Sequence, residues 1–160
     1  MKCFQNQVAI ITGAASGLGL AIATRLSSEG VKLALIDLNE EKLMRSVSQY
    51  GSEVKAYVLD ITDENQVEIT ADHILKHFGK IDILVNSAGI TGKTNIHSHR
   101  TDTADVRKVF EVNYYGSYFT SKYVLPFMLQ QQYGRVLHIA SISPLLVFPA
   151  AVPFIRLNTI

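Results

Sequence analysis

The sequence predicts an α/β domain with a doubly wound parallel sheet, and three observations support this class. Short apolar runs alternate with helical stretches along the chain. The runs at 8–11 and 81–85 are mostly apolar instead of alternating, as expected for parallel strands covered on both faces. A glycine turn joins the first run to the first helical stretch. We therefore expect a Rossmann-like sheet in the order 3-2-1-4-5, incomplete at its C-terminal side.

Each element of this sheet can be placed along the chain. Strands are expected over 7–12, 31–36, 54–59, 81–85 and 135–140. Helices are expected over about 17–29, 40–50, 63–78 and 105–130. Asp63 is the predicted N-cap of the third helix and Gly79 its stop. In this topology a cofactor binds at the switch between strands 1 and 4, outside their carboxyl ends.

Composition excludes several classes of function. The chain has 160 residues, enough for one domain, with 48% hydrophobic and 18% charged residues. Its net charge is +1 without a basic stripe, so no nucleic-acid partner is expected. Cys3 is the only cysteine, which fits a reducing, cytoplasmic location. The sequence indicates neither a signal peptide nor a membrane span. His73 and His77 lack a third ligand, so no metal site is expected.

The glycine turn Thr12-Gly13-Ala14-Ala15-Ser16-Gly17-Leu18-Gly19 indicates a phosphate-binding function. Gly13 allows a sharp exit from the strand, and Gly17 and Gly19 allow close backbone approach to a pyrophosphate and to the sheet. The helix that begins here presents unpaired N–H groups to an anion. Ser16 and Leu18, within the turn, join the predicted cofactor-binding residues. The alternative is an ordinary glycine turn between strand and helix.

An acidic residue follows the second strand. Asp37 lies about 18 residues beyond Gly19, close to the spacing of a carboxylate that holds the adenosine ribose. Such a carboxylate accepts hydrogen bonds from the ribose 2′-OH and repels a 2′-phosphate, so NAD is expected in preference to NADP. The alternative is that Asp37 serves as the N-cap of the next helix.

The fourth predicted strand runs directly into Asn86-Ser87-Ala88-Gly89. With the turn at 12–19, this resembles the short-chain dehydrogenase/reductase family, which has a TGxxxGxG turn and an Asn-Asn-Ala-Gly strand end. Ser87 replaces the second Asn. The resemblance extends over about residues 5–143, so we assign 1–143 to a dinucleotide-binding domain. It implies that Asn86, Ala88 and Gly89 border the cofactor.

The resemblance implies further site residues. Asp60 and Ile61, after the third strand, match the pair that contacts adenine. Asn113, in Val112-Asn113-Tyr114, matches the family's active-site Asn, and Ser141 matches its catalytic Ser. Two alternatives stay open at this point. Asn113 could be a solvated or back-bonded residue within a helix, and Ser141 could be a loop residue after a strand.

The family transfers hydride between a nicotinamide and a carbonyl or alcohol carbon. A Tyr acts on the substrate oxygen as general acid/base, and a Lys four residues later lowers the Tyr pKa. The matching positions here hold Phe154 and Asn158, so we expect the chain to be inactive as written. Tyr118 and Lys122 form a Tyr-x-x-x-Lys that precedes Ser141, which argues against catalysis. A nucleotide-binding module or a non-functional fragment is the alternative.

Residues 144–160 are predicted to form an irregular apolar tail. Three prolines interrupt residues 144–154, and the segment does not resemble the family's corresponding loop. A truncated or frame-shifted family member explains this most simply. The strand at 135–140 is then an open edge that favours self-association. Residues 89–95 resemble a loop of members acting on sugars or sugar acids, so the expected partner is a small carbonyl or alcohol.

Overall fold

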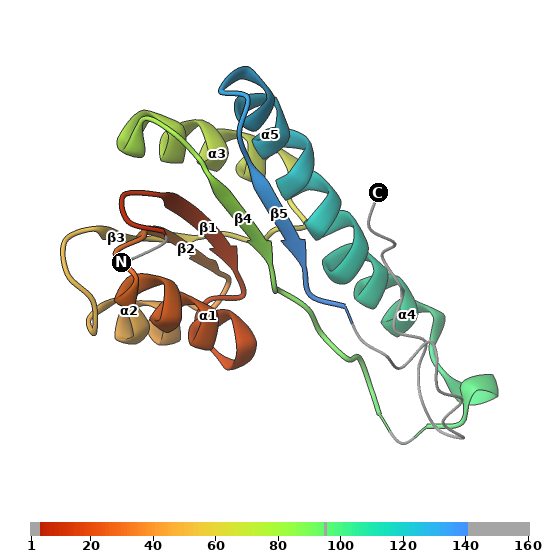
Figure 1. Ribbon diagram of the computed structural model, residues 1–160. Helices are drawn as coiled ribbons and strands as arrows, with labels where there is room; N and C mark the ends of the chain where they lie inside the picture. Colours follow the sequence, from red (N-terminus) through yellow and green to blue (C-terminus); the bar gives the residue numbers. More distant parts are fainter. Residues whose placement is uncertain (1–3, 95, 141–160) are drawn as a thin grey trace.

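The computed structural model describes residues 4–94 and 96–140 and has a five-stranded parallel sheet. The strands lie in the order β3-β2-β1-β4-β5, so the predicted doubly wound class and strand order are confirmed (Figure 1). The strands are β1 Val8–Thr12, β2 Lys32–Asp37, β3 Val54–Val58, β4 Ile83–Asn86 and β5 Arg135–His138. The helices are α1 Gly17–Ser28, α2 Glu40–Val47, α3 Glu64–Phe78, η1 Ser98–Arg100, α4 Thr103–Phe110, η2 Glu111–Gly116 and α5 Ser117–Gln130.

Local sequence explains most helix boundaries. The Asn39 side chain accepts a hydrogen bond from Lys42 N at the start of α2, and Asp63 accepts from Gln66 N at the start of α3. Gly79 ends α3 in the left-handed conformation. The cap and stop predicted for the third helix are therefore confirmed.

The expectation of a single helix over 105–130 was wrong in its start and in its continuity. The helix begins at Thr103, after the Asp102 cap, and residues 111–116 form the π-helical segment η2 between α4 and α5. Periodicity alone did not distinguish this one wider turn from the α-helix around it. The fifth strand is also shorter than expected and ends at His138.

The core has two layers, one on each face of the sheet. Ile11 and its neighbours pack against α1 and α2, whereas Ile10 packs against α3 and α5. Figure 1 shows these helix pairs on opposite sides of the strands. All five residues of β1 are buried. Burial on both faces explains why the strand reads as a continuous apolar run.

β5 forms one edge of the described sheet. Its side chains Val136 and Leu137 are 37% and 49% exposed. The predictions for Ser141, Phe154, Asn158 and the tail at 144–160 fall outside the described residues. Within the part that is described, no helix has the length and apolarity needed to cross a bilayer.

Asp82 connects the chain just before β4 to the start of β1 by a hydrogen bond, so its substitution should destabilise the fold. This side chain is 5% exposed, and its Oδ2 accepts a 2.8 Å hydrogen bond from Val8 N. We expect Asp82→Ala to lower the free energy of unfolding by about 2 kcal/mol, because it leaves a buried N–H without an acceptor. Urea unfolding measures this.

Glu53→Ala is the matched control. Glu53 pairs with Lys32 at 2.9 Å, but the two side chains are 62% and 38% exposed. Loss of an exposed pair should change the stability by less than about 0.5 kcal/mol. Equal effects of the two substitutions would show that the Asp82 contact contributes no more than a surface charge.

Candidate functional site

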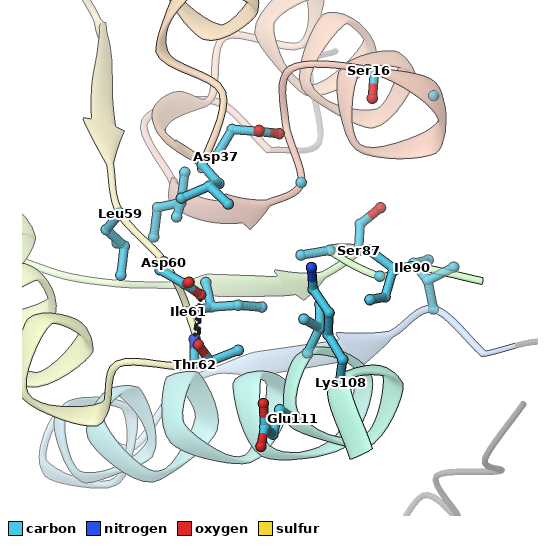
Figure 2. Close-up of a pocket in the computed structure, with 18 of the residues that line it drawn as sticks. Ser16, Asp37, Leu59, Asp60, Ile61, Thr62, Ser87, Ile90, Lys108 and Glu111 are labelled. Carbon is cyan, nitrogen blue, oxygen red and sulfur yellow. Dashed lines mark hydrogen bonds between the residues drawn. The ribbon is translucent and has the colours of Figure 1, made fainter. Parts of the chain in front are cut away.

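A cavity of about 900 Å³ opens at the carboxyl ends of β1 to β4 and is closed on the other side by α4 and η2 (Figure 2). Most of the site residues predicted from the sequence line it. These are Gly13, Ser16, Gly17, Leu18, Asp37, Asp60, Ile61, Ala88 and Gly89. Gly19, Asn86 and Asn113 do not line it, and Ser141 lies outside the described residues. The cavity is at the predicted switch between β1 and β4.

Two glycines let the β1–α1 turn lie directly against other backbone. A Cβ on Gly13, whose φ is +66°, would lie 2.7 Å from Ala88 Cα at the end of β4. A Cβ on Gly19 would lie 2.2 Å from the carbonyl oxygen of Gly13. Both distances are too short for any side chain. These glycines therefore allow close packing of turn, helix and strand end.

Gly17 has a different environment. Its φ is +55°, and a Cβ placed there would meet nothing within 4 Å. The residue lines the cavity, so its backbone faces open space. The preceding Ser16, at the N-cap of α1, makes no side-chain capping bond. The first-turn N–H groups of α1 thus have no side-chain cap, which is the arrangement a phosphate group needs.

Thr12 holds the end of β4 in place. This side chain is 1% exposed, and its Oγ1 accepts hydrogen bonds of 3.1 Å from both Ser87 N and Ala88 N. Sequence reasoning missed this contribution. The signal was a hydroxyl residue at the end of an apolar strand, directly before the glycine turn.

Asp37 ends β2 at the cavity wall. Its Oδ2 accepts from Ala15 N at 3.0 Å, and its Oδ1 accepts from Asn39 N at 2.9 Å. The N-cap of α2 is Asn39, so the alternative interpretation of Asp37 as that cap is wrong. A carboxylate oxygen accepts more than one hydrogen bond, so each oxygen keeps acceptor capacity for a ligand hydroxyl.

Asp60 and Ile61 lie after β3. Asp60 Oδ1 accepts from Thr62 N at 2.9 Å and from Thr62 Oγ1 at 2.8 Å, which fixes the side chain at the cavity wall (Figure 2). Ile61 is 6% exposed and packs so closely on η2 that a Cβ on Gly116 would lie 2.5 Å from its Cδ1. Ile61 thereby joins the strand ends to the helix across the cavity.

Asn86 is buried behind the cavity, with only 2% of its surface exposed. Its Oδ1 accepts from Thr120 Oγ1 at 2.7 Å, and its Nδ2 contacts Ser121 Oγ at 3.1 Å and His138 Nδ1 at 3.2 Å. All these contacts are internal. The sequence places Asn86 next to a cofactor, whereas the structure shows it connecting β4 to α5 and β5.

Asn113 binds the loop that follows β4. Its Oδ1 accepts from Ile90 N at 2.8 Å, and its Nδ2 donates to Ile90 O at 2.9 Å. The alternative that Asn113 bonds back within its own helix is not what the structure shows. The π-helical segment carries this side chain, and the two bonds fix Ile90, which lines the cavity.

The Tyr118 and Lys122 pair does not line the cavity. Tyr118 is 51% exposed, and Lys122 Nζ lies 2.7 Å from Glu64 Oε1. The hydrogen bond from Lys122 lowers the pKa of the Glu64 carboxyl. This lysine links α5 to α3.

Sequence reasoning also missed three charged residues in the cavity wall: Arg107, Lys108 and Glu111. Helical spacing in the sequence could have indicated that these residues face the site. Lys108 lies four residues before Val112, which lines the same cavity, so the two share a helix face.

The family model described as short chain dehydrogenase matches residues 7–153. The chain belongs to the short-chain dehydrogenase family. The match continues past residue 143, where the resemblance read from the motifs ended.

Relatives and solved structures agree with this family. The chain is 40% identical over 149 residues to 2-(R)-hydroxypropyl-CoM dehydrogenase of Xanthobacter autotrophicus, covering 90% of this chain and 60% of the relative. It matches NAD+-bound xylitol dehydrogenase with a TM-score of 0.88 at 36% identity, covering 93% of this chain and 58% of the other. A family member from Burkholderia phymatum in complex with NAD gives a TM-score of 0.87 at 35% identity, with 92% and 53% covered. This short-chain dehydrogenase sequence therefore spans a little over half the length of these proteins.

The network around Asn86 makes stability depend on the protonation of His138. The Asn86 amide nitrogen also donates to Ser117 O at 3.3 Å, and a carbonyl oxygen can only accept. This contact fixes the orientation of the amide, so that the atom facing His138 Nδ1 is the donor Nδ2. Nδ1 must then accept, and burial lowers the pKa of His138 below its ordinary 6.5. The unfolded chain binds this proton first. The contribution is therefore complete above about pH 6.5 and is lost as the pH falls below it.

Urea unfolding of the wild type and His138→Gln at pH 7.5 and 5.5 measures this effect. Gln keeps an acceptor but does not titrate, so the variant should lose less stability on acidification than the wild type. The same pH dependence in both proteins would contradict the assigned role of His138.

Proposed function

We propose that this chain binds NAD(H) and forms the cofactor-binding part of a dehydrogenase that acts on a carbonyl or alcohol carbon. One observation carries the proposal: Gly17 presents open backbone to a cavity whose wall carries the Asp37 carboxylate. An uncapped helix start suits a diphosphate, and a carboxylate at the end of the second strand suits ribose hydroxyls. The NAD-bound relatives of the same fold support this choice of cofactor.

Each part of the nucleotide has a proposed partner. The turn containing Ser16, Gly17 and Leu18 would hold the diphosphate, while Gly13 and Gly19 allow the turn to adopt its position. Asp37 would accept from the adenosine ribose, and Asp60 with Ile61 would border adenine. Ala88 and Gly89 would form the strand-end wall, with Asn86 supporting that wall from behind.

NAD, when bound, supplies the hydride acceptor or donor for the reaction. In this proposal Ser141 hydrogen-bonds the substrate oxygen, and Asn113 positions the Ile90 loop beside the cavity. The Tyr and Lys positions of the family correspond to Phe154 and Asn158. Phe154 has no proton to exchange, and Asn158 has no charge. We therefore propose that the chain as written binds the cofactor without appreciable turnover, as a nucleotide-binding module.

The substrate class is a small alcohol or carbonyl compound. The names of the similar proteins include a hydroxypropyl-CoM dehydrogenase and a xylitol dehydrogenase, and both substrates carry a secondary alcohol. We extend this to a sugar or sugar acid because the sequence of residues 89–95 resembles a loop of family members that act on such compounds. The single cysteine supports a cytoplasmic location.

Replacement of Asp37 should relax the cofactor preference. We expect the wild type to bind NADH more tightly than NADPH, because the carboxylate attracts a 2′-OH and repels a 2′-phosphate. Asp37→Ala, and Asp37→Asn, which keeps an acceptor for Asn39 N, should reduce this preference by about tenfold. Fluorescence titration with both nucleotides gives the two dissociation constants.

Asp72→Asn is the control, because Asp72 is an exposed acid on α3, outside the cavity. This substitution removes the same charge and should leave the preference unchanged. NADPH binding equal to or tighter than NADH binding in the wild type would contradict the role given to Asp37.

Turnover by the chain should be far below that of an ordinary enzyme. Loss of a positioned acid/base costs about 10²–10⁴ in rate. An NADH-oxidation assay over sugar-acid, polyol and acyl-type carbonyl compounds measures this. Turnover at ordinary enzyme rates that Ser141→Ala abolishes would overturn the inactive assignment. Turnover abolished by Tyr118→Phe would instead identify that tyrosine as the acid/base.

The exposed β5 edge should promote self-association. Val136 and Leu137 place apolar surface on the last strand of the described sheet, and open edges pair with other chains. Leu137→Lys should shift the mass measured by size-exclusion with light scattering toward the monomer. Met44→Lys, at a 47% exposed position on α2, should not. A wild-type protein that is monomeric at all concentrations would contradict this expectation.

A further inference from the structure

The α4 side of the cavity carries positive charge. Arg107 and Lys108 both line the cavity and are exposed. Lys108 shares its helix face with Val112, another lining residue, so its aliphatic stem starts from the cavity wall. Figure 2 shows the Lys108 side chain rising from the helix with its nitrogen directed into the cavity.

The Lys108 ammonium has no acidic partner within residues 4–94 and 96–140. The ion pairs in this part of the chain use Arg25, Lys32, Arg45, Lys80 and Lys122. Glu111, three residues after Lys108, lines the same cavity without pairing with it. An ammonium that is directed into a concave site and has no carboxylate partner there is available to an anionic ligand.

The charges of the cavity are separated in space. Asp37 and Asp60 lie where β2 and β3 end, and both already accept hydrogen bonds from protein groups. The positive groups are the start of α1 on one side of the cavity and, on the α4 side, the Arg107 guanidinium and the Lys108 ammonium. Figure 2 shows Lys108 reaching into the cavity from the helix opposite Ser16. The ADP half of NAD(H), whose hydroxyl and amino donors lie at one end and whose diphosphate lies at the other, matches this distribution.

We propose that Lys108 binds the diphosphate of the nucleotide from the α4 side, across the cavity from the first turn of α1. This inference rests on the proposed NAD(H)-binding function and adds a specific cationic contact to it. Helix-terminal N–H groups carry only part of an elementary charge, so they leave much of a doubly charged diphosphate uncompensated. Lys108 supplies a full charge from the α4 side of the cavity.

ADP and adenosine separate the charge of Lys108 from its packing. Isothermal calorimetry with the full 160-residue chain would compare both ligands in the wild type, Lys108→Met and Lys108→Arg. Met keeps an apolar stem and removes the charge, so ADP should bind about tenfold more weakly. Adenosine should bind equally well, and Arg should restore ADP binding. Added salt should weaken ADP binding more in the wild type than in Lys108→Met.

Lys76→Met is the matched control, since Lys76 is exposed on α3 and does not line the cavity. It should leave ADP binding unchanged. Unchanged ADP binding in Lys108→Met would overturn the inference while NADH binding by the same protein upholds the proposed function. Equal losses for adenosine and ADP would also overturn it, because they would assign Lys108 to packing on the base. A wild type that binds neither NADH nor ADP would contradict both.

Discussion

The cavity depends on a direct backbone contact between the β1–α1 turn and the end of β4. No side chain lies between the two segments at this contact. The space beside Gly13 is filled by Ala88, and the space beside Gly19 by the carbonyl of Gly13. Thr12 Oγ1 secures the same junction by accepting two N–H groups from the β4 end. With turn, helix and strand end held this closely, the open side of Gly17 is left facing the cavity. The same geometry that closes the fold at the switch point therefore creates a place for an anion.

The second requirement is that the opposite wall keeps its position. Asn113, in the π-helical segment η2, forms two hydrogen bonds with the Ile90 backbone. Ile61 packs against Gly116 in the same segment. Behind the cavity, Asn86 joins β4 to α5 and β5. Hydrogen-bonded polar groups of this kind specify one arrangement because each loses its partner if the elements shift. The cavity is therefore bounded on both sides by elements that hydrogen bonds and close packing hold together.

The sequence predicts what local chemistry determines. The strand order follows from apolar runs and connections, Asp63 and Gly79 mark helix ends, and the glycine turn predicts the position of the cavity. Other features depend on contacts between residues distant in sequence, and these were not predictable. Asn86 reads as a cofactor residue from its motif, yet its partner His138 is 52 positions away. The π-helical turn arises where Asn113 meets Ile90, 23 positions away. Lys108 and Arg107 read as ordinary surface charges until the fold places their helix over the cavity.

We infer that Gly17 keeps its side of the turn open for a dinucleotide. Calorimetric titration of NADH into the wild type and Gly17→Ala measures this, with Gly51→Ala as the control because a Cβ there also meets nothing within 4 Å. A methyl group at Gly17 meets no protein atom, so the variant should stay folded at a cost of about 1 kcal/mol for its backbone angle. We expect one NADH per wild-type chain, at least about tenfold weaker binding in folded Gly17→Ala, and no change in Gly51→Ala. Equal NADH affinity in all three folded proteins, or no binding by the wild type, would contradict it.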